Sequence, residues 1–327
     1  MKTARSVEIQ SFGEPEVMHV VERPLPAPGP GEVQLAQTAI GINFLEVSQR
    51  QGGGYPLPLP TGLGFEAAGR VEAVGEGVTD FQEGDRVAYI AAGVGAYADR
   101  RNVAADKLVR LPDSISDETA AAMMFKGLTA QYLVRKTHAV KAGDLLLVHA
   151  ATGGVGQILT RWATALGATV IGATTSPEKI PVAEAAGCKA VIDISQPDWP
   201  EAFLAASGGR KADVVYDSVG KDTLLKSLQC AAQFGLVVVY GAASGPAPAI
   251  EPMLLNRSGG LFLTQPSLFL HNASTDLFRD NAADLFDAID KGHVTVDIAA
   301  RYPLADIAEA HRAFESRKLA GAVVVTP

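Results

Sequence analysis

Residues 145–156 read LLLVHAATGGVG. The first five are an apolar run typical of a buried strand, and the glycines that follow mark a tight turn into a helix expected at 155–166. The turn fits the dinucleotide-binding fingerprint, with Ala151 at its first glycine position. Gly153 lets the backbone approach a pyrophosphate, Gly156 lets the helix pack closely on the strand, and the helix N-terminus attracts the anion. The stretch therefore predicts a βαβ unit that binds a dinucleotide.

The chain after this fingerprint alternates between apolar strands and helical segments. A helix is expected over 178–186. The expected strands are 168–173, 190–192, 212–216 and 235–240. Such alternation is typical of a parallel sheet with helices on both faces. We therefore predict an α/β fold class in which residues 126–298 form a doubly wound parallel-sheet (Rossmann) domain.

The chain before the fingerprint has a different pattern. Short alternating segments, such as EVQLA at 32–36, are broken by proline and glycine, which indicates a β-rich region. The C-terminal part holds an expected helix at 306–317 and a last strand at 322–325. We assign residues 299–327 to the same β-rich domain as residues 1–125.

Composition and charge argue against several classes of protein. The 327 residues carry 28 Lys and Arg against 36 Asp and Glu, so the net charge is −8 and nucleic acid is not expected as a main partner. Apolar runs such as 236–240 are far shorter than the roughly 20 residues of a membrane-spanning helix. Cys188 and Cys230 are too few for a disulfide framework and are expected to be buried. No export signal is visible, so a cytoplasmic protein is expected.

The end of the second strand of a dinucleotide-binding fold selects the cofactor. An Asp or Glu there would hold the ribose 2′-hydroxyl of NAD. Here Thr174 takes that place, and Ser176 and Lys179 follow as a hydrogen-bond donor and a cation suited to a 2′-phosphate. These residues predict NADPH as the cofactor, although Lys179 also fits a solvated helix lysine.

Several motifs in one order are more specific than the glycine turn alone. They are GINF at 41–44, GLGFEAAG at 62–69, GDRV at 84–87, FKGLTA at 125–130 and YDSVG at 216–220. With the fingerprint, they make nearly the whole chain resemble the medium-chain dehydrogenase/reductase superfamily, in its zinc-independent quinone oxidoreductase (zeta-crystallin-like) branch. The resemblance implies a β-rich GroES-like catalytic domain in addition to the Rossmann domain.

The resemblance also implies catalysis without a metal. Zinc-dependent members of that superfamily carry a Cys where this chain has Asn43, and a His-Glu pair where it has Phe65-Glu66. Without zinc to polarise an alcohol oxygen, reduction of an already electrophilic substrate is the natural reaction. We expect NADPH-dependent hydride transfer to a quinone or a related conjugated carbonyl.

The site residues follow from the same resemblance. Asn43, Lys126 and Thr129 are expected around the nicotinamide, with Lys126 or Asn43 stabilising the developing oxyanion. Tyr55 completes the expected catalytic set, on a substrate side that it forms with Phe44 and Leu57. The other expected cofactor contacts are Thr152, Gly153, Gly154, Val155, Gly156, Thr174, Ser176, Lys179, Ser218, Tyr240, Gly241, Leu263 and Arg317.

Alternatives stay open for the residues and for the function. Asn43 also fits a turn residue bonded to its own backbone, Lys126 a surface lysine, and Glu66 a structural rather than catalytic role. An alkenal or enoyl reductase would use the same cofactor geometry, and a non-catalytic NADPH-binding protein would keep the fingerprint. The resemblance further implies a homodimer, for which GLFLT at 260–264 offers an apolar strand at the far edge of the parallel sheet.

Overall fold

The computed structural model describes residues 2–54, 56–316, 318–319 and 321–327. The chain divides into two compact units. Unit 1 comprises Met1–Leu128, Ser274–Phe286 and Val296–Pro327, and unit 2 comprises Thr129–Ala273 and Asp287–Thr295. These units assign 274–286 to the β-rich part of the chain, whereas the sequence analysis placed that segment in the Rossmann domain.

The sheet of unit 2 is parallel, and its strand order reverses near the middle. Its strands lie in the order β11-β10-β9-β12-β13-β14. They are β9 (Leu145–His149), β10 (Thr169–Thr174), β11 (Ala190–Asp193), β12 (Ala212–Asp217), β13 (Ala231–Val239) and β14 (Phe262–Thr264). The next two strands along the chain, β10 and β11, therefore extend the sheet to one side of β9, and the last three, β12, β13 and β14, extend it to the other. This is the doubly wound arrangement that the sequence predicts.

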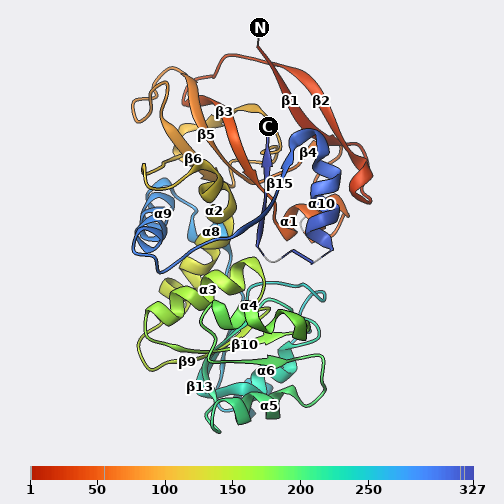
Figure 1. Cartoon of the computed structure of the whole chain (residues 1–327), viewed down its shortest axis with the longest axis vertical. Coiled ribbons are helices and arrows are strands. Elements are labelled where there is room, and N and C mark those ends of the chain that lie inside the picture. Colours follow the sequence, from red (N-terminus) through yellow and green to blue (C-terminus); the bar gives the residue numbers. More distant parts are fainter. Residues whose placement is uncertain (1, 55, 317, 320) are drawn as a thin grey trace. The chain divides into compact units, whose positions relative to one another are not determined.

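The helices of unit 2 cover both faces of this sheet. They are α3 (Gly154–Ala165), α4 (Ile180–Ala185), α5 (Trp199–Ala206), α6 (Leu224–Cys230), α7 (Pro252–Arg257) and α8 (Leu268–His271). Helices α3 and α4 lie over one face, and α5 and α6 lie over the other (Figure 1). The fully buried residues between the layers include Leu147, Val215 and Phe203. Because apolar side chains cover both sides of its strands, this sheet is buried.

Two expected segments of unit 2 differ from the structure. The helix expected over 178–186 is a 3₁₀ turn, Pro177–Lys179, followed by α4. Pro181 has no N–H to continue one helical ladder from the turn, so α4 begins anew with this proline in its first turn. Strand β13 begins four residues before the expected start at 235.

Unit 1 is built on two sheets. The larger has the order β15-β16-β3-β5-β6-β8, with β7 also paired to β3, and the smaller has the order β2-β1-β4. The strands are β1 (Lys2–Ile9), β2 (Met18–Leu25), β3 (Glu32–Gly41), β4 (Thr61–Gly62), β5 (Glu66–Val74), β6 (Arg86–Ile90), β7 (Arg100–Ala104), β8 (Val109–Arg110), β15 (Ile298–Pro303) and β16 (Ala322–Thr326). Strand β16 pairs with β3, which joins the C-terminal segment to the N-terminal one.

The helical segments of unit 1 are short, apart from the two that continue into unit 2. They are α1 (Phe44–Arg50), α10 (Ile307–Glu315) and the 3₁₀ turns Pro15–Val17, Ala105–Lys107 and Leu304–Asp306. The two that continue are α2 (Asp117–Tyr132), which a π-helical turn (Leu133–Thr137) follows, and α9 (Thr275–Asp290). Among the described residues, no helix combines the length and the apolar character that crossing a membrane requires.

The first half of α9 packs within unit 1, which explains why 274–286 belongs there. Arg279 Nη1 lies 3.0 Å from an oxygen of Asp80. A Cβ on Gly127 in α2 would lie 2.8 Å from Leu285, so this glycine lets the two helices approach closely. These contacts join residues that are far apart in the sequence, and helical periodicity alone gives no sign of them.

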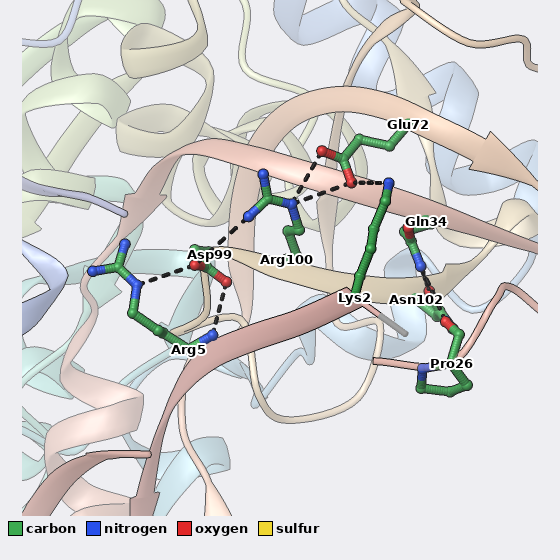
Figure 2. A network of polar contacts seen from close by, with 8 residues as sticks. All are labelled: Lys2, Arg5, Pro26, Gln34, Glu72, Asp99, Arg100 and Asn102. Carbon is green, nitrogen blue, oxygen red and sulfur yellow. Dashed lines mark hydrogen bonds and ion pairs between the residues drawn. The ribbon is translucent and has the colours of Figure 1, made fainter. Parts of the chain in front are cut away.

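A polar network on the surface of unit 1 ties three strand segments together (Figure 2). Glu72 of β5 accepts hydrogen bonds from Lys2 at 3.0 Å and from Arg100 at 3.1 Å. Asp99 accepts one from Arg5 at 3.1 Å. These pairs are partly exposed, so each contributes little to stability, of the order of 1 kcal/mol or less.

Candidate functional site

Asn43 and Lys126 meet in the interior of unit 1. Asn43 is the N-cap residue of α1, and Lys126 lies in α2. The Lys126 ammonium donates to Asn43 Oδ1 at 2.7 Å and to the carbonyl oxygen of Ile42 at 3.0 Å. Only 6% of Lys126 is exposed, so the surface-lysine alternative is wrong. Among the described residues, Lys126 Nζ thus has two oxygens at hydrogen-bond distance. A third oxygen, Glu66 Oε1, lies 3.6 Å away, so a ligand oxygen would share the third N–H group with Glu66.

The Asn43 amide is oriented differently from the oxyanion-donor hypothesis. Its Nδ2 donates to Glu66 Oε1 at 2.8 Å and lies 3.5 Å from Glu46 Oε1. Both amide hydrogens therefore face carboxyl groups. Of the two donors considered for a developing oxyanion, the geometry favours Lys126, and Asn43 instead supplies an acceptor that holds Lys126.

Sequence reasoning missed Glu46. This carboxyl accepts the backbone N–H of Asn43 at 2.9 Å and is fully buried. The Asn-x-x-Glu spacing at the start of α1 resembles a capping box, in which a carboxyl at the third helical position bonds back to the N-cap. This spacing is the sequence signal that predicts contact between Glu46 and Asn43.

The cluster holds two carboxyl groups and one ammonium away from water. Burial raises the pKa of Glu46 to about 8. Burial also raises the pKa of Glu66, while the Lys126 ammonium and the N–H groups of Phe125 and Asn43 oppose that effect. Glu66 has the Phe125 N–H at 2.6 Å, the Asn43 amide at 2.8 Å and the Lys126 ammonium at 3.6 Å, whereas Glu46 accepts from N–H groups of Asn43. On this geometry we assign the negative charge to Glu66 and the proton to Glu46. The cluster is then neutral overall, with Glu66 and Lys126 as its ion pair.

The other residues expected near the substrate or the nicotinamide are less completely placed. Thr129 lies one turn after Lys126 in α2 and is 6% exposed. Phe44 is 55% exposed, and its ring centroid lies 4.7 Å from that of Phe314. Leu57 is half-buried against the core of unit 1. Two further predicted site residues, Tyr55 and Arg317, lie outside the described residues.

In unit 2, the fingerprint loop has the geometry of an anion site. Ala150 follows β9 with φ 48°, and the N–H of Gly153 donates to the Ala150 carbonyl at 2.9 Å. Gly153 is the N-cap of α3 and makes no side-chain cap, so the first N–H groups of α3, those of Gly154, Val155 and Gly156, stay available to a ligand. A Cβ on Gly156 would lie 2.2 Å from the Ala150 carbonyl oxygen, which confirms the predicted close packing of helix on strand. The loop therefore fits the pyrophosphate of a dinucleotide.

The carboxyl ends of β9, β12 and β13 bring three more predicted residues together. Ser218 Oγ donates to the carbonyl of His149 at 3.5 Å. A Cβ on Gly241 would lie 2.6 Å from the Ser218 carbonyl oxygen, so the backbones touch there. Burial raises the pKa of Tyr240 to about 12, and a hydrogen bond with Ser218 partly opposes this. Since β9 and β12 flank the reversal of strand order, these residues lie where dinucleotides bind in such sheets.

The residues predicted for the 2′-phosphate follow β10. Thr174 ends this strand, and its hydroxyl accepts the N–H of Ser176 at 3.0 Å, which shapes the turn that carries Lys179. The carboxylate of Asp193, whose backbone is opposite Thr174 in the sheet, accepts the N–H of Ser195 at 2.9 Å. Leu263 lies apart from this turn, in β14, and pairs with β13.

No group of three or more His, Cys, Asp or Glu within the described part of the chain could hold a metal ion.

Both cysteines are buried, as predicted. Burial raises the pKa of the Cys188 thiol to about 11 and that of Cys230 to about 12. Neither thiol therefore has the thiolate character of a reactive cysteine.

Comparison with known proteins identifies relatives along the whole chain. Residues 29–144 match the alcohol dehydrogenase GroES-like domain, and residues 154–273 match the zinc-binding dehydrogenase family. A quinone oxidoreductase of Pseudomonas aeruginosa is 43% identical over 99% of this chain and 100% of its own length. The crystal structure of Escherichia coli quinone oxidoreductase complexed with NADPH is 41% identical, with a TM-score of 0.94 and full coverage of both chains.

The chain belongs to the quinone oxidoreductase family. Another relative is a 2-haloacrylate reductase of Burkholderia sp, 42% identical over 98% of this chain and 98% of its own length. Quinone oxidoreductases and a reductase named for a different substrate thus resemble this chain to a similar degree. The expected family and α/β fold class are confirmed, and the GroES-like match agrees with the β-rich character of unit 1.

We expect the Glu46→Gln substitution to change how the free energy of unfolding of this quinone oxidoreductase family member depends on pH. The carboxyl of Glu46 has a pKa near 4.5 when unfolded and about 8 when folded. The folded state therefore holds a proton that the unfolded state has lost, and wild-type stability falls as the pH rises from 4.5 to 8. The Gln variant lacks this effect, so its unfolding free energy relative to wild type should rise by a few kcal/mol from pH 5 to pH 8, since one pKa unit is about 1.4 kcal/mol.

Urea unfolding at the two pH values measures this difference. Glu72→Gln is the control, because Glu72 lies in the partly exposed network of unit 1 and should shift stability equally at both values. Parallel pH profiles for wild type and Glu46→Gln would show that Glu46 is ionised in the folded protein.

Proposed function

We propose that this chain catalyses the NADPH-dependent, zinc-independent reduction of quinones. The observation that carries the proposal is the full-length similarity to quinone oxidoreductases, one of them solved with NADPH. The anion-binding loop after β9 supports the cofactor, and the buried Lys126 ammonium supports the chemistry. We further propose that residues 126–298, apart from the segment 274–286 that belongs to unit 1, are the dinucleotide-binding domain, that 1–125 with 299–327 form the catalytic domain, and that the protein works in the cytoplasm.

The residues proposed to hold NADPH divide by the part of the cofactor they suit. The loop 152–156 suits the pyrophosphate through its backbone N–H groups. Ser176 and Lys179 suit the 2′-phosphate as a donor and a cation, next to Thr174. The others are Asn43, Lys126, Thr129, Ser218, Tyr240, Gly241, Leu263 and Arg317. When bound, NADPH supplies the hydride that reduces the substrate.

The proposed catalytic role of Lys126 is electrostatic. Two of its N–H groups are held by Asn43 and Ile42, which fixes the ammonium in place. The third donates to the oxygen of the substrate on which negative charge develops. A donor that is held in position before the reaction costs little reorganisation when the charge appears. Tyr55 belongs to the same proposed catalytic set and lies outside the described residues.

A panel of electron acceptors tests the function. With NADPH, we expect turnover of benzoquinone and naphthoquinone, and little or no oxidation of primary alcohols with NADP⁺. A 2-haloacrylate belongs in the same panel because one relative is named for that substrate. Activity on the haloacrylate without quinone turnover would replace the proposal with carbon–carbon double-bond reduction. NADPH binding without any turnover would favour a non-catalytic binding protein.

We expect Lys179→Ala to weaken NADPH binding much more than NADH binding. A charged hydrogen bond to a 2′-phosphate is worth about 1.5–3 kcal/mol, which corresponds to about ten- to a hundredfold in affinity. Fluorescence titration of both cofactors against wild type and variant measures the change. Lys189→Ala, another lysine of unit 2, is the matched control. Equal wild-type affinity for NADPH and NADH would contradict the proposed specificity.

We propose that the protein is a homodimer that pairs through β14. This strand lies at an edge of the sheet of unit 2, and its Phe262 is 62% exposed. Pairing two copies of β14 would satisfy the open edge and cover this side chain. Light scattering should give twice the chain mass of 34.1 kDa for wild type and a lower mass for Phe262→Glu. A wild-type monomer at micromolar concentration would refute the pairing.

A further inference from the structure

Glu66 lies at the centre of the polar cluster, and its two oxygens have different partners. Oε2 accepts the backbone N–H of Phe125 at 2.6 Å, and Oε1 accepts the Asn43 amide at 2.8 Å. The Lys126 ammonium lies 3.6 Å from Oε1. The start of β5, the N-cap of α1 and the middle of α2 therefore meet at one fully buried carboxylate.

This carboxylate decides which way the Asn43 amide faces. An amide has a donor end and an acceptor end, whereas an ionised carboxylate only accepts. The Nδ2 end therefore faces Glu66, and Oδ1 is left for the Lys126 ammonium at 2.7 Å. A reversed amide would place Oδ1 against a carboxylate oxygen and an N–H group against an ammonium, and both contacts would be repulsive.

The last residue of β3, Gly41, has no side chain and so leaves room for the Glu66 carboxylate. A Cβ on Gly41 would lie 2.2 Å from Glu66 Oε1 and 2.2 Å from the carbonyl oxygen of Ala121. Both distances are far below contact separation, so a side chain at 41 would push the carboxylate away. Glu66 is thus enclosed by backbone as well as hydrogen bonded, and its place relative to Asn43 is tightly constrained.

We propose that Glu66 is a positioning residue for the reduction: it orients the Asn43 amide, and through that amide and its own charge it sets where the Lys126 ammonium stands. Glu66 itself touches neither substrate nor cofactor in this proposal. The inference rests on the proposed function of Lys126. It adds that the Glu66 carboxylate, which contacts Lys126 and Asn43 but not the substrate, affects the rate of reduction. Displacement of a catalytic group by about 1 Å is enough for a hundredfold loss of rate.

A double-mutant cycle of Glu66→Gln and Lys126→Met tests whether Glu66 acts through Lys126. With NADPH and benzoquinone as substrates, Glu66→Gln is expected to lower kcat about ten- to a hundredfold. The KM for NADPH and the KM for benzoquinone are each expected to change less than about threefold. The double variant is expected to be as slow as Lys126→Met alone, because Glu66 has then no ammonium to position. If the fold-losses of kcat in the two single variants multiply in the double variant, the proposal is overturned. It is also overturned if the kcat of Glu66→Gln equals that of wild type.

Glu72→Gln is the matched control. It makes the same change of carboxylate to amide on the same strand, six residues further along, where Glu72 pairs with Lys2 and Arg100 (Figure 2). Its kcat is expected to stay within about twofold of wild type. If Glu66→Gln does not fold, Glu66→Asp takes its place, because it keeps the charge and shortens the reach. The same loss of kcat is then expected, and full activity would overturn the proposal.

A measurement on the cofactor-free protein separates this proposal from the proposed function. The ¹H–¹⁵N NMR signal of the Lys126 ammonium, identified by its loss in Lys126→Met, is expected in wild type because the group is buried and hydrogen bonded. In Glu66→Gln the signal should shift or broaden, and in Glu72→Gln it should not. An unchanged signal in Glu66→Gln would refute the positioning role. Absence of quinone turnover in wild type, with the shift observed, would refute only the proposed function.

Discussion

The buried ion pair of Glu66 and Lys126 is the interaction on which the polar interior of unit 1 depends. Moving two charges out of water is costly, and the cost is met only where geometry and additional hydrogen bonds are good. Here Phe125, Asn43 and Ile42 supply those bonds. If either charge were removed, the other would stay buried without compensation. The positions of α1, α2 and β5 are therefore linked by electrostatics as well as by apolar packing.

A second buried carboxyl, that of Glu46, lies in the same cluster, which explains why one of the two carboxyls is protonated. Glu46 and Glu66 both face the amide nitrogen of Asn43, and one ammonium cannot balance two negative charges. The raised pKa of Glu46, caused by burial, resolves this by keeping that group neutral at physiological pH. By the resemblance, Asn43 and Phe65 stand at the metal-ligand positions of zinc-dependent members of the superfamily, and Glu66 stands where those members have a Glu beside the metal. In this chain the positive charge next to Glu66 is the ammonium of Lys126.

Unit 2 depends on a different constraint, which is the close approach of backbone to backbone. The sheet places the carboxyl ends of β9 and β12 side by side at the point where the strand order reverses. Gly156 and Gly241 then bring the neighbouring segments nearer than any side chain would permit. As a result, the N–H groups at the start of α3 and the segments after β12 and β13 lie along one edge of the sheet. Such an edge is the usual place for a dinucleotide.

Sequence by itself determined the strands of unit 2 and the helix after the glycine turn, because the signals there are local. The apolar run at 145–149 is β9 to the residue, and the glycine turn that follows does begin a helix. The doubly wound order also follows from the alternation of strands and helices. Local signals failed where a proline restarted the helix after β10, and where the first half of α9 packs within unit 1.

Only the tertiary structure decided the chemistry of the cluster. Asn43 and Lys126 were expected near the same ring of the cofactor, but they are 83 positions apart and no periodicity says which atoms meet. The direction of the Asn43 amide depends on Glu66, 23 positions away, and the proton on Glu46 depends on how deeply both carboxyls are buried. Residue type and spacing identify the participants. Orientation and charge state follow from long-range packing, which local patterns do not record.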